Sequence, residues 1–300
     1  MESRADIHVH TKYSGIARLG FLRFPESVVE PYDAVKKAQN LGLKVLAITD
    51  HNSIYGAIKA KEFGKEIGMQ VVVGEEISTS DGEIIGLYLN EEIPPGLTAE
   101  ETIDRIRDQD GIVMAPHPFS LHCPSLGEKI AFLDIDAIET INAGHIDGYA
   151  NSIAAQKSES GKWAIVGGSD SHSISTIAHA YTTFEGETAE DLRKAIFSKT
   201  TAACGARMPL QVAISWSIGV VLASDFMILK SILGMIKEVD LHDPVIKKIS
   251  LMTTGKKLLA LVGSLIYLTP PVPYLCAITG EKLLKRLARK HEAENEYKLS

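Results

Sequence analysis

The chain has 300 residues, of which 45% are hydrophobic and 23% are charged, a composition typical of a globular protein. Its formal net charge of −7 excludes a global positive field that would attract nucleic acid, although a local basic site remains open. Three scattered cysteines exclude a disulfide framework, and the N-terminus leads into a predicted strand without an apolar signal-peptide core. We therefore expect a cytoplasmic protein.

Predicted strands and helices alternate along the first two thirds of the chain. The strands are expected over residues 5–10, 44–48, 70–73, 84–88, 111–115, 137–142, 163–167 and 180–184. Helices are expected to begin near residues 31, 53, 98, 149 and 188, where capping residues or proline precede apolar residues at helical spacing. This alternation predicts an α/β fold with a mainly parallel sheet.

The first predicted strand carries two histidines, His8 and His10, in the sequence Asp-Ile-His-Val-His-Thr. Residues two apart on a strand point to the same face, so both imidazoles would approach one point, as metal ligands do. One such pair is weak evidence, because two polar edge residues would look the same. Asp170 and His172 repeat the spacing after strand 163–167.

Other potential ligands also follow predicted strands, namely His51, Glu76, His117 and Asn142. Each has an ordinary structural explanation when taken alone, such as helix entry for His51 or a rigid turn for His117. Together they favour a common site, because five of the ten histidines fall at strand ends with acids between them. Active sites of α/β proteins form at the carboxyl ends of strands, and this ligand set suits Zn, Mn or Fe.

The order of these motifs resembles that of the PHP (polymerase and histidinol phosphatase) family. The motifs are H-x-H-T near the start, then T-D-H, G-x-E-I-S, P-H-P and G-S-D-S-H after successive strands. The resemblance covers residues 6–205, and residues 180–186 resemble the PHP-associated C-terminal segment. It implies a distorted seven-stranded (β/α) barrel with two or three divalent metal ions at the carboxyl-end rim, and metal-dependent phosphoester hydrolysis.

The resemblance also implies a role for each candidate ligand. One metal would be held by His8, His10 and Asp170, a second by His117 with Asn142 as a weak or indirect contributor, a third by His51 and His172, and Glu76 would bridge the first two. Asp6 and Asp50 would orient neighbouring imidazoles. Glu75 is expected to face the opposite side of its strand.

One position departs from the family pattern. Gly15 follows Ser14 where the family commonly has an aspartate that binds the third metal. Glu26 or Asp33 could replace it, water could substitute, or only two metals could bind tightly. We favour a weak or exchangeable third site.

The implied reaction is attack of a metal-bridged hydroxide on phosphorus, because bridging cations acidify water and neutralise phosphoryl charge. The catalytic set would be His8, His10, Glu76, Asp170 and His172. Candidate substrate-binding residues are Lys12, Arg18, Arg23, His122 and His179, for which a solvated loop or ordinary packing is the alternative.

The preferred substrates are nucleotide phosphates or the 5′ ends of short single-stranded oligonucleotides, in the manner of a 5′→3′ exonuclease. An acidic chain argues against gripping long duplex DNA, since Lys and Arg supply most of that affinity. The alternatives are a phosphatase for non-nucleotide esters, or a metal-binding interaction module with weak catalysis.

The character of the chain changes after residue 207, so we assign residues 1–207 to the phosphoesterase domain and 208–300 to a helical extension. An amphipathic helix is expected over 225–239 and a basic helix over 281–291. The uncharged run 258–280 approaches the ~20 residues that span a bilayer, but Pro270, Pro271 and Pro273 would break such a helix. We expect soluble packing or a homo-oligomer contact there, with peripheral membrane association as the alternative.

Overall fold

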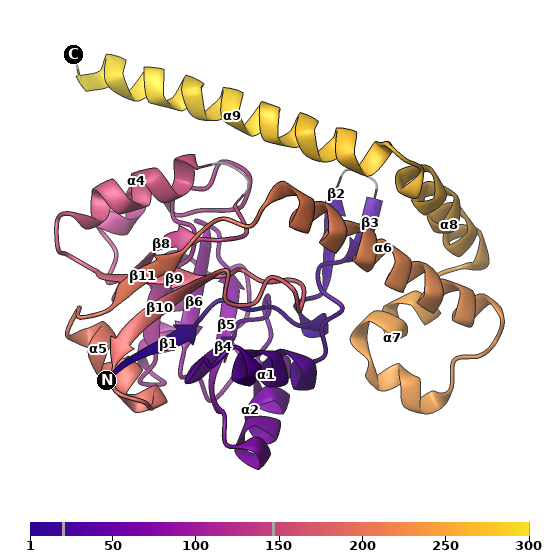
Figure 1. Cartoon of the computed structure of the whole chain (residues 1–300), viewed down its shortest axis with the longest axis horizontal. Helices are drawn as coiled ribbons and strands as arrows, with labels where there is room; N and C mark the ends of the chain where they lie inside the picture. The colour runs from indigo at the N-terminus through magenta and orange to yellow at the C-terminus, as the bar shows by residue number, and fades with distance from the viewer. Residues whose placement is uncertain (20–21, 146–147, 300) are drawn as a thin grey trace.

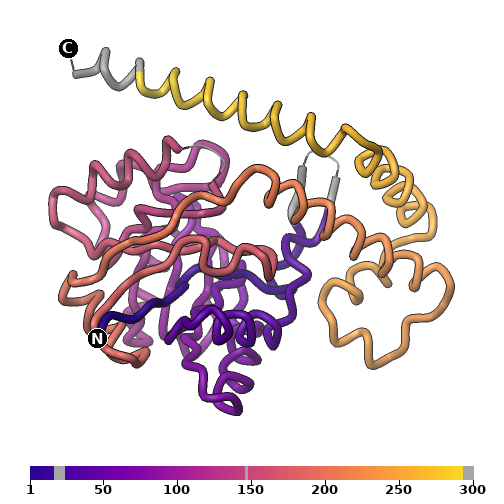
Figure 2. Tube along the Cα trace, viewed as in Figure 1, coloured from indigo at the N-terminus to yellow at the C-terminus, as the bar shows by residue number. Residues whose placement is uncertain are grey.

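The computed structural model describes residues 1–19, 22–145 and 148–299, without the side chains of residues 17–19, 22–23 and 293–299 (Figure 2). Nine strands form one sheet in the order β11-β10-β1-β4-β5-β6-β7-β8-β9. Their bounds are β1 Glu2–Asp6, β4 Val45–Ile48, β5 Gln70–Ser78, β6 Glu83–Leu87, β7 Ile112–Ala115, β8 Ala137–Asn142, β9 Ala164–Gly168, β10 Ala180–Glu185 and β11 Ala202–Gly205.

The two edges of this sheet meet, so the sheet curls into a nearly closed barrel. The Thr182 hydroxyl of β10 accepts from the Gly167 N–H of β9 at 3.0 Å and lies 2.9 Å from the Gly167 carbonyl. The Thr201 hydroxyl donates to the Ile165 carbonyl at 2.8 Å. The predicted α/β barrel is therefore confirmed.

The strand count and the pairing differ from expectation. The barrel has nine strands rather than seven, and its pairings divide into four parallel and four antiparallel. Only β6 and β10 run against the common direction, because each is antiparallel to both of its neighbours. The strand β11, Ala-Ala-Cys-Gly, has no apolar alternation that would have revealed it.

Five helices accompany the barrel: α1 Pro31–Asn40, α2 Tyr55–Ile67, α3 Ala99–Arg107, α4 Tyr149–Ser158 and α5 Ala189–Phe197. The first four cover the outside, where residues such as Val35 and Ile106 join Leu46 in one buried cluster. A second cluster fills the barrel interior and includes Leu192 of α5. Alternate strand side chains thus serve two cores, as expected for strands buried on both faces.

Local signals explain where these helices begin. Capping boxes start α3 at Thr98 and α5 at Thr188, as predicted. The expected cap at Ser53 is wrong, because α2 begins at Tyr55 behind Ile54, and the Ser53 hydroxyl only accepts from the Tyr55 N–H at 3.3 Å. The chain between β1 and α1 holds a short 3-10 helix, η1 Lys12–Ser14, and a separate hairpin, β2 Ile16–Leu19 and β3 Leu22–Pro25, where a loop was expected.

The C-terminal part is helical, with α6 Leu210–Ile232, η3 Glu238–His242, α7 Pro244–Ser250, α8 Thr254–Leu268 and α9 Val272–Leu299. Figure 1 shows α6 leading away from the barrel and α9 returning above α4, where the Tyr149 and His291 rings lie 6.4 Å apart. The expected helix over 225–239 is wrong in its bounds, because α6 begins at Leu210, within the uncharged residues 208–224, and ends at Ile232. The prolines do divide the run 258–280 into α8 and α9.

Candidate metal centre

Seven predicted ligands gather at the carboxyl-end rim of the barrel. His8 and His10 follow β1, His51 follows β4, Glu76 lies on β5, His117 follows β7, and Asp170 and His172 follow β9. We call these seven residues the histidine–carboxylate cluster. The first and the last of them, His8 and His172, lie 164 residues apart in sequence, and the curled sheet brings them together.

The centre of the cluster is a close approach of two imidazoles. The Nε2 atoms of His8 and His10 lie 3.1 Å apart. Glu76 Oε2 is 3.3 Å and 3.2 Å from them, and Asp170 Oδ1 is 3.5 Å and 3.3 Å from them. His8, His10 and Glu76 are at most 1% exposed. Two nitrogens and two carboxylate oxygens thus converge on one point, and of the four side chains only that of Asp170, at 13%, is exposed to an appreciable extent. This donor set suits a divalent cation.

The far side of each ring is held so that Nε2 faces the centre. His8 Nδ1 lies 3.0 Å from Glu139 Oε1, and His10 Nδ1 lies 2.9 Å from Ser14 Oγ. The Ser14 hydroxyl donates to Asp50 Oδ1 at 2.9 Å, so toward His10 it can only accept. In the neutral rings both hydrogens therefore reside on Nδ1, and both Nε2 lone pairs point into the cluster.

The predicted roles of Asp50 and Asp6 in orienting imidazoles need correction. Asp50 orients His10 through Ser14 rather than by direct contact. Asp6 accepts from the backbone N–H groups of Ser169 at 3.0 Å and Ala178 at 2.8 Å, so it fixes the loop after β9 rather than an imidazole.

Glu76 presents its two oxygens to different histidines. Its Oε1 lies 3.0 Å from His117 Nε2, whereas its Oε2 faces His8, His10 and, at 3.3 Å, His51 Nδ1. This is the arrangement that a bridging carboxylate requires. Glu75 points away, as expected, and its Oε2 accepts from the Ile93 N–H at 2.9 Å.

A third group of imidazoles surrounds His10. The rings of His51 and His172 lie 4.7 Å and 4.2 Å from the His10 ring, and one nitrogen of each of the three lies within 4.8 Å of the others. Glu26 Oε2 approaches His51 Nε2 at 3.7 Å, and this buried atom has no hydrogen-bond partner among the described residues. Asp33 is exposed on α1. Of the two proposed substitutes for the missing aspartate, Glu26 therefore lies at the site.

Backbone geometry also distinguishes the cluster. Asp170 has φ 49° and His117 has φ 28°, in a region that residues with a side chain rarely adopt. Such strain is typical of functional sites. Close packing adds a further demand, because a Cβ at Gly168 would stand 2.5 Å from His8 Cβ and 2.4 Å from Glu139 Oε1.

Sequence reasoning missed two acids of the site, Glu139 and Glu83. Glu139 is buried within β8, between apolar positions, and binds His8 from behind. Glu83 opens β6 and lies 3.7 Å from both His51 Nδ1 and His117 Nε2. The signal for Glu139 was a single charged residue in a strand whose other five residues are uncharged. Glu83 follows a turn, where an acid is ordinarily solvated.

Asn142 lies beside the cluster but turns its oxygen away. Its Nδ2 donates to Glu139 Oε2 at 2.8 Å and to Asp170 Oδ2 at 3.1 Å. Its Oδ1 accepts from the backbone N–H of His145 and faces His145 Nδ1, both at 3.1 Å. Since the oxygen is the ligand atom of an amide, this geometry favours positioning of Asp170 over direct metal binding.

The predicted substrate-binding residues are more dispersed. Lys12 Nζ binds Glu30 Oε1 at 2.5 Å and Asp243 Oδ2 at 2.9 Å, so it ties the barrel to α7 rather than facing open solvent. The side chains of Arg18 and Arg23 lie outside the described residues. His122 is exposed in the loop after β7, with its ring 4.7 Å from that of His145, and His179 immediately precedes β10.

The cluster contains strongly perturbed ionisable groups. Burial opposes charge on His10 and His117, but hydrogen bonds and attraction to carboxylates outweigh it and raise the pKa of His10 to about 10 and of His117 to about 9. Burial likewise opposes ionisation of Glu76 and Asp170, yet the histidines hold the pKa of each well below its usual value.

Four other groups resist charging. Burial lowers the pKa of His51 to about 4 and of His172 to about 3, with repulsion from His10 adding to both. Burial raises the pKa of Glu83 to about 8 and of Glu26 to about 7, with repulsion from Glu76 adding to both. The acids at the centre thus depend on imidazolium for positive charge, and a divalent cation would supply it without protonating the ligands.

The sequence matches the PHP domain over residues 6–153 and the PHP-associated segment over residues 148–201. The uncharacterized protein MJ1587 of Methanocaldococcus jannaschii is 53% identical over 154 residues, which are 51% of this chain and 90% of that protein. The chain belongs to the PHP family. A second protein of that organism, MJ0417, is 31% identical over 188 residues, covering 60% of this chain and 70% of that protein.

The PHP fold is also seen in a solved structure. A two-domain protein from Bacteroides vulgatus, which contains a predicted PHP-like metal-dependent phosphoesterase, aligns with a TM-score of 0.57 at 16% identity. The alignment covers 69% of this chain and 65% of that one, so both proteins have parts that the other lacks. At this identity the likeness concerns the fold.

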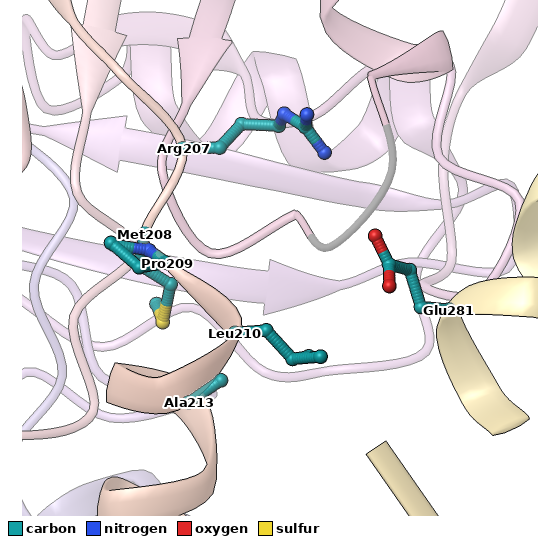
Figure 3. Close-up of a pocket in the computed structure, with 6 residues that line it drawn as sticks. All are labelled: Arg207, Met208, Pro209, Leu210, Ala213 and Glu281. Carbon is teal, nitrogen blue, oxygen red and sulfur yellow. The ribbon is translucent and has the colours of Figure 1, made fainter. Parts of the chain in front are cut away.

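The helical extension borders the PHP centre without forming it. Trp216 of α6 lies with its ring 5.5 Å from that of His172. Figure 3 shows a pocket at the root of the extension, lined by Arg207, Met208, Pro209, Leu210, Ala213 and Glu281. These six residues include no member of the histidine–carboxylate cluster, so the pocket is a junction between the start of α6 and α9.

Proposed function

We propose that this PHP protein is a metal-dependent phosphoesterase that uses the histidine–carboxylate cluster. The observation that carries the proposal is the 3.1 Å approach of the His8 and His10 Nε2 atoms beside the carboxylates of Glu76 and Asp170, with both imidazoles and Glu76 at most 1% exposed. Such a set of lone pairs and carboxylates is stable only with positive charge at its centre.

The cluster residues divide the work of holding cations. His8, His10 and Asp170 would hold one, His117 a second, and Glu76 would be shared between them, while His51, His172 and Glu26 surround a weaker third position. Bound divalent cations would lower the pKa of a coordinated water and offset charge on phosphoryl oxygens. Glu139 and Ser14 keep the imidazoles aimed, and burial of the cluster keeps bulk water from weakening these interactions. Zn, Mn and Fe all suit the donor set.

The proposed substrates are nucleotide phosphates or the 5′ ends of short single-stranded oligonucleotides. The net charge of −7 supports a small substrate, because long duplex DNA needs many lysine and arginine contacts. A non-nucleotide phosphate monoester satisfies the same chemistry and is the second candidate. A nuclease function therefore depends on which substrate the protein prefers, because the cluster itself does not distinguish nucleotide from non-nucleotide esters.

The test is a hydrolysis panel on purified protein loaded separately with Zn, Mn or Fe. The panel contains mononucleotides, short 5′-phosphorylated oligonucleotides and p-nitrophenyl phosphate, with His8→Ala as the control. We expect turnover that His8→Ala abolishes. Bound metal without turnover above the His8→Ala control would refute the enzyme and favour the interaction module.

We further propose that the extension associates with an anionic lipid surface. The helix α6 has the length and mean hydropathy of a membrane span, 23 residues and 1.9, and only 11% of its apolar window is buried. On α8, Leu259 and Leu265 are each 70% exposed. These apolar side chains are not covered by the barrel, and the basic residues of α9 complement anionic headgroups.

Flotation with anionic and neutral vesicles tests this assignment, with sedimentation velocity run in parallel. We expect flotation with anionic vesicles and loss of flotation for Leu259→Glu/Leu265→Glu, whereas the barrel-surface control Phe132→Glu should float. A stable dimer that does not float with the vesicles would refute lipid binding and assign the surface to a second copy of the chain. A cytoplasmic location, peripheral to the membrane, is the corresponding prediction.

A further inference from the structure

A second group of potential ligands lies beside the histidine–carboxylate cluster and takes no part in it. His122 and Cys123 belong to the loop after β7, and His145 follows β8. One ligand atom from each lies within 4.8 Å of the other two. Unlike the seven residues of the PHP centre, this group includes a thiol, and thiolate with imidazole is a set that selects Zn²⁺ or a similar soft cation.

His145 is already in the form that a metal requires. Asn142 Nδ2 donates to two carboxylates and Asn142 Oδ1 accepts the backbone N–H of His145, so the orientation of the amide is fixed. His145 Nδ1 must then donate to Asn142 Oδ1, and the lone pair lies on Nε2. His145 is 1% exposed, and its Nε2 atom has no hydrogen-bond partner in the part of the chain that the structure describes.

The other two ligands are held by the fold of their loop. The Ser120 hydroxyl accepts from the backbone N–H of His122 at 3.3 Å and of Cys123 at 3.0 Å. The Ser120 N–H donates to the His117 carbonyl at 3.0 Å, which ties the loop to the PHP centre. The loop therefore presents a thiol and an imidazole next to an unsatisfied, buried nitrogen.

We propose that Cys123, His145 and His122 form a separate thiolate-containing site for one Zn²⁺ ion next to the PHP centre. Three protein ligands leave one tetrahedral position for solvent or a substrate oxygen. Binding would couple the loop after β7 to the segment after β8, and the ring of His117, 5.3 Å from that of His145, lies between the two sites.

The test titrates Co²⁺ into the reduced, metal-free full chain and follows the near-ultraviolet thiolate-to-cobalt charge-transfer band. None of the seven cluster residues has a thiol, so the band reports a cysteine ligand outside the cluster, and variants of the three cysteines identify which one. We expect the band in the wild type, its loss in Cys123→Ser, and its retention in Cys204→Ser and Cys276→Ser. Zn²⁺ should displace the band, and His145→Gln should weaken Co²⁺ binding at least tenfold.

Glu76→Gln separates this site from the PHP centre, because it impairs the cluster and leaves the thiol intact. Retention of the band in Glu76→Gln supports a separate site. Absence of the band in the wild type, its persistence in Cys123→Ser, or its loss in Glu76→Gln would each overturn the proposal. Circular dichroism of every variant identifies any loss of signal that comes from unfolding.

A different observation concerns the rim beside Gly15, and it rests on the proposed function. The ion pair between Lys12 and Asp243 holds α7 against η1. Lys248 of α7 places its Nζ 3.8 Å from the point where a Cβ on Gly15 would stand, and its charge attracts the Glu26 carboxylate. Lys248 is exposed and forms no hydrogen bond or ion pair with any residue that the structure describes.

We infer that Lys248 is a substrate-binding residue that the extension contributes to the PHP centre. Its ammonium group lies beside Gly15, on the side where the family aspartate is missing, and it attracts Glu26, whose Oε2 is 3.7 Å from His51 Nε2. There it can contact a non-bridging phosphate oxygen of a substrate held at the cluster. The extension would thereby supply a phosphate contact that Lys12, paired with two acids, does not.

Lys248→Ala tests this role, and Lys247→Ala, an exposed lysine on the same helix, is the matched control. We expect KM for the phosphate ester to rise about tenfold in Lys248→Ala, with metal content unchanged and partial rescue by Lys248→Arg. Calorimetric binding of inorganic phosphate to the metal-loaded protein should weaken in parallel. Equal behaviour of Lys248→Ala and Lys247→Ala in both measurements would overturn the assignment. Absence of wild-type turnover would refute the proposed function alone, since phosphate binding still tests Lys248.

Discussion

The barrel rim buries polar side chains, whereas the helical extension exposes apolar side chains to water. At the rim, His8, His10 and Glu76 are charged or polar and yet at most 1% exposed, whereas on α8 the apolar Leu259 and Leu265 are each 70% exposed. A buried charge needs a partner of defined geometry within a few ångströms, so the rim is specified atom by atom. An exposed apolar surface needs only to be covered. The rim therefore suits small ligands of defined geometry, whereas the extension suits a partner that covers a large apolar surface.

Among substitutions at the rim, we expect Glu76→Gln to have the largest effect. An amide cannot offer two anionic oxygens, so we expect loss of bound metal and a fall in kcat/KM of roughly 10³-fold or more. Metal analysis and the hydrolysis panel measure both. Glu100→Gln, an exposed change on α3, should leave both unchanged. Full metal content in Glu76→Gln would show that the rim is not organised around this carboxylate.

Glu139→Gln tests whether metal binding also depends on the hydrogen bonds behind the His8 ring. Glu139 accepts from His8 Nδ1, the His117 N–H and Asn142 Nδ2, all of which donate to it. A glutamine must turn its own N–H groups toward at least one of these donors. We expect metal affinity to fall about 10–100-fold, measured by competition with a chelator. An unchanged affinity would mean that ring orientation at His8 is set elsewhere.

Glu75→Gln probes a buried acid of β5 that lies outside the cluster. Burial raises the pKa of Glu75 from 4.5 to about 8. The folded state then binds a proton that the unfolded state releases, so wild-type stability should fall as pH rises from 4.5 to about 8. The variant lacks this dependence, and its free energy of unfolding should exceed that of the wild type increasingly over this range. Parallel pH profiles from urea unfolding would contradict the prediction.

Lys12→Met tests the contact that joins the barrel to the helical extension. The change removes the ion pair of Lys12 with Asp243, whose side chains are 12% and 13% exposed. We expect a loss of about 1–2 kcal/mol in stability and faster amide exchange in α7. Lys44→Met, which breaks an exposed pair with Glu187, should cost less than about 0.5 kcal/mol. Unchanged exchange in α7 would show that other contacts hold the extension.

Strand periodicity predicted the α/β fold, and strand-end position predicted that the ligands gather at one edge of the sheet. The closed barrel was an expectation from the resemblance to the PHP family. The sequence did not predict Glu139, Trp216 or Lys248, since these approach the site only through packing between elements distant in sequence. Glu83 was missed because it follows the turn of the β5–β6 hairpin, where an acid is ordinarily solvated. Lys12 shows the limit most clearly, because its partner Asp243 lies 231 residues away. Asn142 lies where expected, but only the structure shows that its oxygen faces His145.

The placement of β1 between β4 and β10 has a consequence for biosynthesis. His8 and His10 leave the ribosome long before Asp170, His172 and the antiparallel partner of β1, the strand β10, and β11 follows these in turn. The nascent chain therefore carries an incomplete metal centre, with five of its seven ligands, until Asp170 and His172 have emerged. Metal capture should coincide with closure of the barrel once β11, which ends at Gly205, has emerged, so that cation supply and completion of the fold become one event.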